Sequence, residues 1–161
     1  MKKFILQAVL LIGVIGIGLL LYKGSPDLSG LPFMPEQTTF KDVEINTVKI
    51  RVEVANTQAK RSKGLGGRES LGVNEGMLFI FSDAGQHPFW MKGLVFPLDF
   101  IWIKGDTVID LTQNVQPPTP GQADSALPIY QSKEVADKIL EVNAGTIQRL
   151  DIKVGNIVKI Q

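Results

Sequence analysis

A long apolar stretch at the start of the chain constrains its fold most, because such a stretch must be kept away from water. Residues 4–22 carry no charge, and the basic pair Lys2 and Lys3 precedes them. A helix that crosses a ~30 Å hydrocarbon core needs about 20 apolar residues. Residues 1–22 therefore predict a signal anchor, a single transmembrane helix with residues 4–22 in the lipid bilayer. The positive-inside rule then predicts that the rest of the chain lies on the extracytoplasmic side of the cytoplasmic membrane.

A cleaved signal peptide is the alternative reading of the same stretch. Its apolar region is shorter, about 7–15 residues, and a small-x-small cleavage site follows it. No such site follows Tyr22, so we favour an anchor that stays attached, although cleavage remains open. The chain has no cysteine, which excludes a lipoprotein anchor, disulfide bonds and thiolate metal sites.

Composition changes sharply after the apolar stretch. Residues 23–39 contain Pro26, Pro32 and Pro35 among small and polar residues, which is typical of a semi-extended linker. The remaining residues, 40–161, are enough for one domain with its own core. The 17 basic and 16 acidic side chains of the chain are interleaved and give a net charge of +1, so we expect no nucleic-acid partner.

Apolar residues alternate with polar ones along much of this domain, and this period of two predicts strands. The clearest case runs from Val48 to Val54, and residues 77–81 are apolar on both faces, as in a strand buried from both sides. Expected strands cover residues 43–45, 48–54, 77–81, 89–91, 98–103, 107–111, 139–142 and 157–160, with short helices over 58–63, capped by Asn56 or Thr57, and over 143–150, capped by Asn143.

The pattern lacks the alternation of strands and helices that a parallel doubly wound sheet requires. We therefore predict an α+β domain dominated by strands, with a mostly antiparallel, barrel-like sheet and two short helices, preceded by one transmembrane helix. A connection over residues 115–133 contains four prolines and no periodicity, and is unusually long for a compact domain. We expect it to lie beside Trp90 and Lys92, with Tyr130 as an aromatic anchor.

Standard catalytic and cofactor motifs are absent, and so is any histidine cluster for a metal, so no metal or cofactor is expected. The single histidine, His87, precedes Pro88 and is read as a solvated loop residue, with a catalytic base as the alternative.

Polar side chains around residues 87–99 give the best candidate for a binding site. Asp99 lies among apolar residues, and a buried carboxylate needs a cation or a backbone N–H group. We expect an ion pair with Lys92, Arg68 or Arg61. The candidate ligand-binding residues are Trp90, Lys92, Asp99, Arg61, Arg68 and Tyr130.

Several short motifs, in order, resemble the family known as domain of unknown function 192 over residues 40–160. The motifs are Arg61-x-x-Gly64-Leu65-x-x-Arg68-x-x-Leu71, Glu75-Gly76-Met77-Leu78-Phe79-x-Phe81, Phe89-Trp90-Met91-Lys92, Pro97-Leu98-Asp99 and Leu140-Glu141-Val142-Asn143-Ala144-Gly145. The resemblance implies a compact β-rich fold, often secreted or membrane-anchored, and brings no established activity. In the resembling pattern a methionine is usual where this chain has Gly66, and an asparagine where it has Gly93.

Two classes of function remain at this stage. The first is a non-catalytic envelope module that binds a small ligand, a glycan or an envelope protein at the surface around Trp90 and Lys92. The second is a hydrolase-type enzyme that uses Asp99, His87 or Glu141 as acid or base. Because an enzyme needs several positioned titratable groups and this chain supplies few, we favour binding.

Overall fold

The computed structural model describes residues 37–161, of which Thr38–Gln161 form one compact unit. The membrane span expected over residues 4–22, and the linker up to residue 36, lie outside the described residues. In the part that is described, no helix is both long and apolar enough to cross a membrane.

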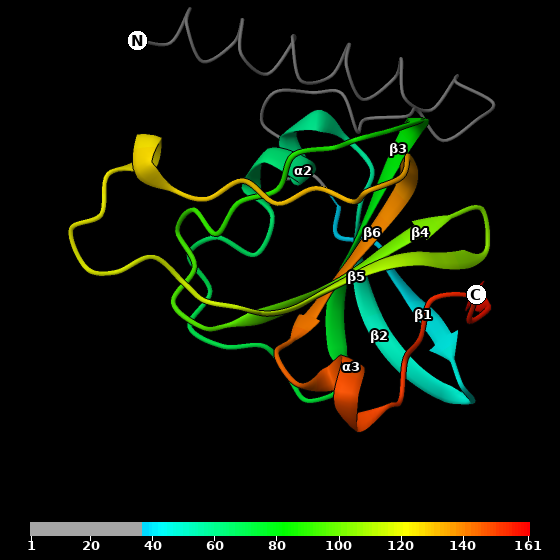
Figure 1. Cartoon of the computed structure of the whole chain (residues 1–161). Helices are drawn as coiled ribbons and strands as arrows, with labels where there is room; N and C mark the ends of the chain where they lie inside the picture. Colours follow the sequence, from blue (N-terminus) through cyan, green and yellow to red (C-terminus); the bar gives the residue numbers. More distant parts are fainter. Residues whose placement is uncertain (1–36) are drawn as a thin grey trace, which may run out of the picture. The chain divides into compact units, whose positions relative to one another are not determined.

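Strands dominate the described chain, with two short α-helices between them (Figure 1). The elements are β1 (Phe40–Ile45), β2 (Val48–Ala55), α2 (Gln58–Lys63), β3 (Glu75–Gly85), β4 (Leu98–Lys104), β5 (Thr107–Val115), the 3-10 turn η1 (Asp124–Ala126), β6 (Ala136–Asn143), α3 (Thr146–Arg149) and β7 (Val158–Ile160).

Most expected elements are confirmed within a few residues, and two details are wrong. Thr57 does cap α2, since its side chain accepts a hydrogen bond from the Lys60 N–H at 3.2 Å. Residues 89–91 do not form a strand, and only Phe89 pairs, in an isolated bridge to Tyr130. Asn143 does not cap α3, whose N-cap residue is Gly145, with no side-chain cap hydrogen bond. The Asn143 amide donates instead to the carbonyl oxygens of Leu71 and Gly72.

The seven strands form one sheet in the order β5-β4-β6-β3-β2-β1-β7. All neighbouring strands are antiparallel except β2 and β3, which are parallel, so the sheet is mixed. A parallel pair needs a crossover connection, and α2 with the residues after it supplies that connection.

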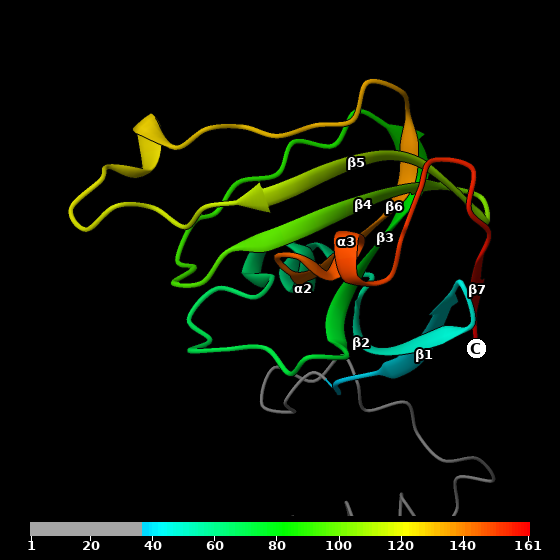
Figure 2. The ribbon, with the colours of Figure 1, turned by 60° about the horizontal axis from the view of Figure 1, so that its bottom comes forward.

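The sheet curls until its two ends meet (Figure 2). Thr107, at the start of β5, forms an antiparallel bridge with Ile157, just before β7. The Val108 N–H donates to the Asn156 carbonyl at 3.0 Å, and the Gly155 N–H donates to the Val108 carbonyl at 2.8 Å. The expected barrel-like architecture is thus present as a curled sheet linked at one end.

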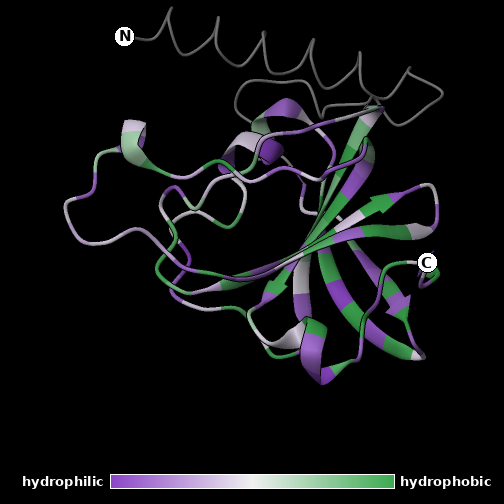
Figure 3. Cartoon of the chain, viewed as in Figure 1, coloured by the Kyte–Doolittle hydropathy of each residue, from purple (hydrophilic) through white to green (hydrophobic). Residues whose placement is uncertain are grey.

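Apolar side chains pack on both faces of this sheet. Along β2, hydrophobic and hydrophilic residues alternate, as a strand with one buried face requires (Figure 3). The inner cluster contains Val43, Ile45, Ile50, Val52, Leu78, Ile101, Ile103, Val108, Leu140, Val142, Ile147, Ile152 and Val158. The outer cluster contains Ala55, Leu65, Met77, Phe79, Phe89, Met91, Leu94, Leu98, Phe100, Trp102, Val115, Ala136 and Ile139. The central strands are therefore buried from both sides.

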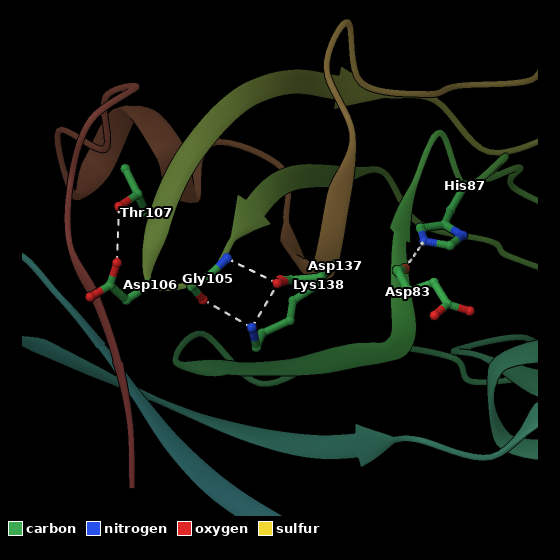
Figure 4. Close-up of polar contacts among 7 residues, drawn as sticks. All are labelled: Asp83, His87, Gly105, Asp106, Thr107, Asp137 and Lys138. Atoms are coloured by element: carbon green, nitrogen blue, oxygen red, sulfur yellow. Dashed lines mark hydrogen bonds and ion pairs between the residues drawn. The ribbon is translucent and has the colours of Figure 1, made fainter.

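Polar contacts hold the β4–β5 turn against β6 (Figure 4). The Gly105 N–H donates to the Asp137 carboxylate at 3.0 Å, and the Lys138 ammonium donates to the Gly105 carbonyl and to Asp137, both at 2.9 Å. Partial burial raises the pKa of the Asp137 carboxyl. The hydrogen bonds from Lys138 and Gly105 and the charge of Lys138 together lower this pKa by more, so it lies below its ordinary value.

Asp99 is buried as expected, but the expected ion pair is wrong. Its carboxylate accepts hydrogen bonds from the backbone N–H of Asn114 at 2.8 Å and of Ile147 at 2.9 Å. Asn114 has a φ of 53° beside a register shift between β4 and β5, and Ile147 lies in the first turn of α3. Two backbone N–H groups, which are distant in sequence and meet only in the folded chain, therefore bind the Asp99 carboxylate instead of the expected lysine or arginine.

Replacing Asp99 with alanine should strand both N–H groups and lower the free energy of unfolding by about 3 kcal/mol, since a hydrogen bond to a charged group contributes about 1.5–3 kcal/mol. Urea unfolding of the two proteins measures the difference. Asp124→Ala is the matched control, because it removes a carboxylate from an exposed ion pair and should cost less than about 1 kcal/mol. An Asp99→Ala protein as stable as the wild type would contradict this role.

Candidate functional site

A pocket with a volume of about 630 Å³ lies over part of the outer face of the sheet. It is bounded by α2 and the glycine-rich turn after it, by the outer side chains of β3, and by the segment from His87 to Leu94. The lining residues are Gln58, Arg61, Ser62, Lys63, Gly64, Leu65, Gly66, Gly67, Phe79, Phe81, His87, Pro88, Phe89, Trp90, Lys92, Gly93, Leu94, Ile129 and Glu141. The size is typical of pockets for small organic molecules.

Aromatic rings form much of the pocket wall. Phe89 packs edge-on against Phe79, with ring centroids 4.9 Å apart, and against Phe81 at 6.4 Å. Trp90 also lines the pocket and keeps 45% of its surface exposed. The wall therefore favours an apolar or aromatic ligand body, and Trp90 lies where such a ligand enters from solvent.

One buried carboxyl group, that of Glu141, lines this apolar pocket. Glu141 lies on β6, directly opposite Met77 of β3 and Phe100 of β4, and is 3% exposed. Within residues 37–161 its carboxyl group has no hydrogen bond and no ion pair. Burial raises the pKa of the Glu141 carboxyl from 4.5 to about 8. At neutral pH the group is therefore mostly protonated and presents an O–H donor to the pocket.

Arg61 ties α2 to β3 while it lines the pocket. Its Nη1 atom donates to the carbonyl oxygens of Asn56 at 2.8 Å and of Ile80 at 2.9 Å. The guanidinium also lies over the Phe81 ring, 4.9 Å from its centroid. Both hydrogen bonds use neutral acceptors, and no acidic side chain of residues 37–161 pairs with Arg61.

His87 lies in the loop after β3, as expected, but its side chain is half-buried in the pocket wall rather than fully solvated. Its ring stacks on Phe81, with centroids 3.5 Å apart and planes 11° apart. Its Nε2 atom lies 3.1 Å from the Asp83 carbonyl oxygen (Figure 4). The imidazole is thus fixed in position by a ring contact and a backbone contact.

The long connection lies beside Trp90 and Lys92, as expected. Phe89 and Tyr130 exchange two backbone hydrogen bonds of 2.8 Å. Lys92 forms an ion pair with Asp124 at 2.6 Å and lies 5.4 Å from the Trp90 ring centroid. These contacts place the connection against the pocket segment.

The structure separates the six candidate binding residues into two groups. Arg61, Trp90 and Lys92 all line the pocket. The other three lie elsewhere: Arg68 pairs with Glu53, Asp99 joins β4 to α3, and the Tyr130 ring packs against Phe100 at 5.8 Å. Ligand binding by any of the six stays a prediction.

Glu141 is missing from that candidate set, although the sequence contained its signal. It is the one charged residue in the apolar run Ile139-Leu140-Glu141-Val142. A charge in a run buried on both faces needs a partner or a function. From the sequence we considered Glu141 as an acid or base of a hydrolase and did not place it among the ligand-binding residues.

The two departures from the resembling pattern meet in the pocket wall. Gly66 and Gly93 both line the pocket, and a Cβ atom on Gly93 would lie 3.7 Å from the Gly66 Cα. The Gly67 N–H donates to the Gly93 carbonyl at 2.9 Å, and Gly93 has a φ of 69°, which favours glycine. This part of the wall is therefore made of backbone without side chains.

The raised pKa of Glu141 predicts a pH-dependent stability. A carboxyl group that is harder to ionise in the folded state contributes stability that is complete below its unfolded pKa, about 4.3, and is lost as pH rises to about 8. The charged or titratable residues around the same pocket are Arg61, Lys63, His87 and Lys92, while Met77 and Phe100, which flank Glu141 on β3 and β4, are uncharged.

Between pH 5 and pH 8, the wild type should lose on the order of 3 kcal/mol of unfolding free energy relative to the Glu141→Gln variant, which cannot ionise. Urea unfolding at several pH values measures this difference. The exposed Glu134→Gln variant is the control and should follow the wild type. Parallel curves for wild type and Glu141→Gln would mean that the Glu141 carboxyl titrates normally.

Comparisons with known proteins agree with the fold. A crystal structure of a protein described as a putative transcription regulator, from Sinorhizobium meliloti 1021, matches with a TM-score of 0.70 and 27% identity over 79% of this chain and 98% of that one. A protein of unknown function from Novosphingobium aromaticivorans DSM 12444 matches with a TM-score of 0.65 and 28% identity over 84% of this chain and 99% of that one. No curated protein matches significantly. Residues 41–160 match the family DUF192, described as an uncharacterized ACR, and the chain therefore belongs to the DUF192 family, as its motifs indicated.

Proposed function

We propose that this DUF192 protein is a membrane-anchored extracytoplasmic module that binds a small molecule in the pocket lined by Trp90 and Glu141. The observation that carries the proposal is the partnerless Glu141 carboxyl group in an aromatic pocket of about 630 Å³. No fully buried side-chain oxygen of the described residues lacks a hydrogen bond, so the unbonded Glu141 carboxyl group reaches the open space of the pocket. A ligand in the pocket can therefore form a hydrogen bond with this group.

A small ligand fits this site better than a glycan or a protein. A stable protein interface needs about 800 Å² from each partner, mostly as an open surface, whereas Glu141 lies inside a pocket and is 3% exposed. A glycan carries many hydroxyl groups that need partners, but four of the lining residues are phenylalanine or tryptophan. We therefore narrow the proposal to a compact molecule with few polar groups.

A hydrolase is the weaker candidate, because the three residues expected to act as acid or base do not lie in one site. Asp99 is engaged with Asn114 and Ile147 and does not line the pocket. Of the three expected acid or base residues, only Glu141 and His87 line the pocket. Glycoside hydrolases typically use two carboxyl groups, and the pocket supplies one. The Sinorhizobium protein's description as a regulator is not extended to this chain, whose net charge of +1 favours no nucleic-acid partner.

An unbiased fragment screen on the full chain in lipid nanodiscs tests binding. The chain has two tryptophans, and Trp102 is buried with its indole N–H bonded to Thr112, so a fluorescence change on binding reports Trp90. We expect hits that change the wild-type signal, lose it in Trp90→Phe, and bind the Glu141→Leu variant more weakly. If no fragment distinguishes wild type from Glu141→Leu, the pocket is not a binding site.

The anchor proposal rests on the apolar residues 4–22 and on Lys2 and Lys3, which are the only charges before them. A reporter active only outside the cytoplasm, fused after Gln161, should be active, and the chain should stay in the membrane fraction after a carbonate wash. The control moves the charge by replacing Lys2 and Lys3 with glutamate. Activity from a cytoplasm-dependent reporter alone would reverse the orientation.

A further inference from the structure

The charged side chains around the pocket have an uneven distribution of sign. Arg61, Lys63 and Lys92 are basic, and Glu141 is the single acidic residue among the lining residues of the described chain. Lys92 is neutralised by Asp124 at 2.6 Å. Two basic side chains, those of Arg61 and Lys63, have no acidic partner within the part of the chain that the structure describes.

Both of these basic groups retain hydrogen-bonding capacity. Arg61 uses only Nη1 in its bonds to Asn56 and Ile80, so Nη2 and Nε have no acceptor among residues 37–161. The side-chain ammonium of Lys63, at the end of α2, has neither a hydrogen bond nor an ion pair in the same part of the chain. A planar carboxylate is the group that a guanidinium binds best, and an ammonium group lining the same pocket adds a second positive charge.

Glu141 adds a second requirement, at a different place in the pocket. Its neutral carboxyl group offers an O–H donor that nothing in the described chain accepts. The matching ligand group is an oxygen that accepts a hydrogen bond, such as a hydroxyl or a carbonyl. Between the two polar points, Phe79, Phe81 and Phe89 require an apolar body.

We propose that the pocket binds a small organic acid whose carboxylate lies at Arg61 and Lys63, whose apolar body lies against Phe79, Phe81 and Phe89, and whose second oxygen lies at Glu141. This inference rests on the proposed binding function and names the class of its ligand.

A cationic ligand is the main alternative, since an ammonium could pair with an ionised Glu141. Such a ligand would have to ionise a carboxyl group in an apolar environment and would lie near the unbalanced charges of Arg61 and Lys63. An anionic ligand does not require Glu141 to ionise, and it is attracted rather than repelled by Arg61 and Lys63. The sign of the ligand charge therefore separates the two possibilities.

The experiment compares probes with one skeleton and different end groups: para-hydroxyphenylpropionate, para-hydroxyphenylpropanol, para-hydroxyphenylpropylamine, and phenylpropionate, which lacks the hydroxyl. Trp90 fluorescence and calorimetry give dissociation constants for the full chain in nanodiscs, and empty nanodiscs correct for partitioning into lipid. We expect the acid to bind about fivefold or more tightly than the alcohol, and the amine to bind most weakly.

Variants then test each end of the ligand separately. Lys63→Gln should weaken binding of the acid by about three- to fivefold and leave the alcohol unchanged, while Lys104→Gln, at an exposed site outside the pocket, should change neither. The hydroxylated acid should lose its advantage over phenylpropionate in Glu141→Leu and retain it in Glu141→Gln, which keeps an N–H donor.

The outcomes separate this inference from the proposed function. Binding of the alcohol or the amine as tightly as the acid would overturn the ligand class and leave small-molecule binding intact. Equal loss of acid affinity in Lys63→Gln and Lys104→Gln would place the carboxylate elsewhere. If none of the four probes binds, the inference fails, and the fragment screen alone decides whether the pocket binds small molecules.

Discussion

The fold depends on burying three central strands, β3, β4 and β6, on both of their faces. Met77, Leu78 and Phe79 are consecutive and all at most 2% exposed, so one face packs inside the barrel while the other needs an external cover. In α/β proteins long helices provide such a cover. Among the described residues, the outer cluster is covered instead by chain segments that contribute Phe89, Met91 and Leu94, joined to the long connection through the Phe89–Tyr130 bridge. Irregular segments cover the outer face of the sheet less completely than helices would, and the pocket lies over the part of this face that they leave uncovered.

Glu141 illustrates the energetic consequence of this arrangement. A leucine at the same position would complete the outer cluster and remove an unpaired polar group from the middle of the sheet. The protein accommodates the carboxyl group by keeping it protonated, as the pKa of about 8 shows. Burial still disfavours the charged form of this acid, and proteins commonly accept such a cost where the group acts on a ligand. Arg61 differs from Glu141 in that its side chain is hydrogen-bonded within the protein. Its bonds to the carbonyl oxygens of Asn56 and Ile80 stabilise the fold, and the same side chain lines the pocket.

Local sequence signals predicted local structure well and failed where distant segments meet. The alternation of Val48 to Val54, the Thr57 cap and the apolar run at residues 77–81 depend on neighbours in the chain, and the structure confirms all three. The parallel pairing of β2 with β3, the amide bonds of Asn143 to Leu71 and Gly72, and the donors to Asp99 depend on contacts between remote residues. The same limit applies to the site. Trp90 and Lys92 were recognisable by type, but only the fold shows that Glu141 shares a pocket with them.

Asp99 and Glu141 are both carboxylates on central strands, and their difference indicates which one serves the fold. Asp99 is 1% exposed and accepts hydrogen bonds from the backbone N–H groups of Asn114 and Ile147, so it joins β4 to β5 and α3, and it does not line the pocket. Glu141 is as deeply buried, on the neighbouring strand, yet no donor from the described chain reaches it. Both carboxyl groups are buried, so burial alone does not identify a functional residue. The two residues differ in whether the protein supplies hydrogen bonds to the carboxyl group. Asp99 has such bonds and Glu141 has none from the described chain, so we look for the function of this domain at Glu141.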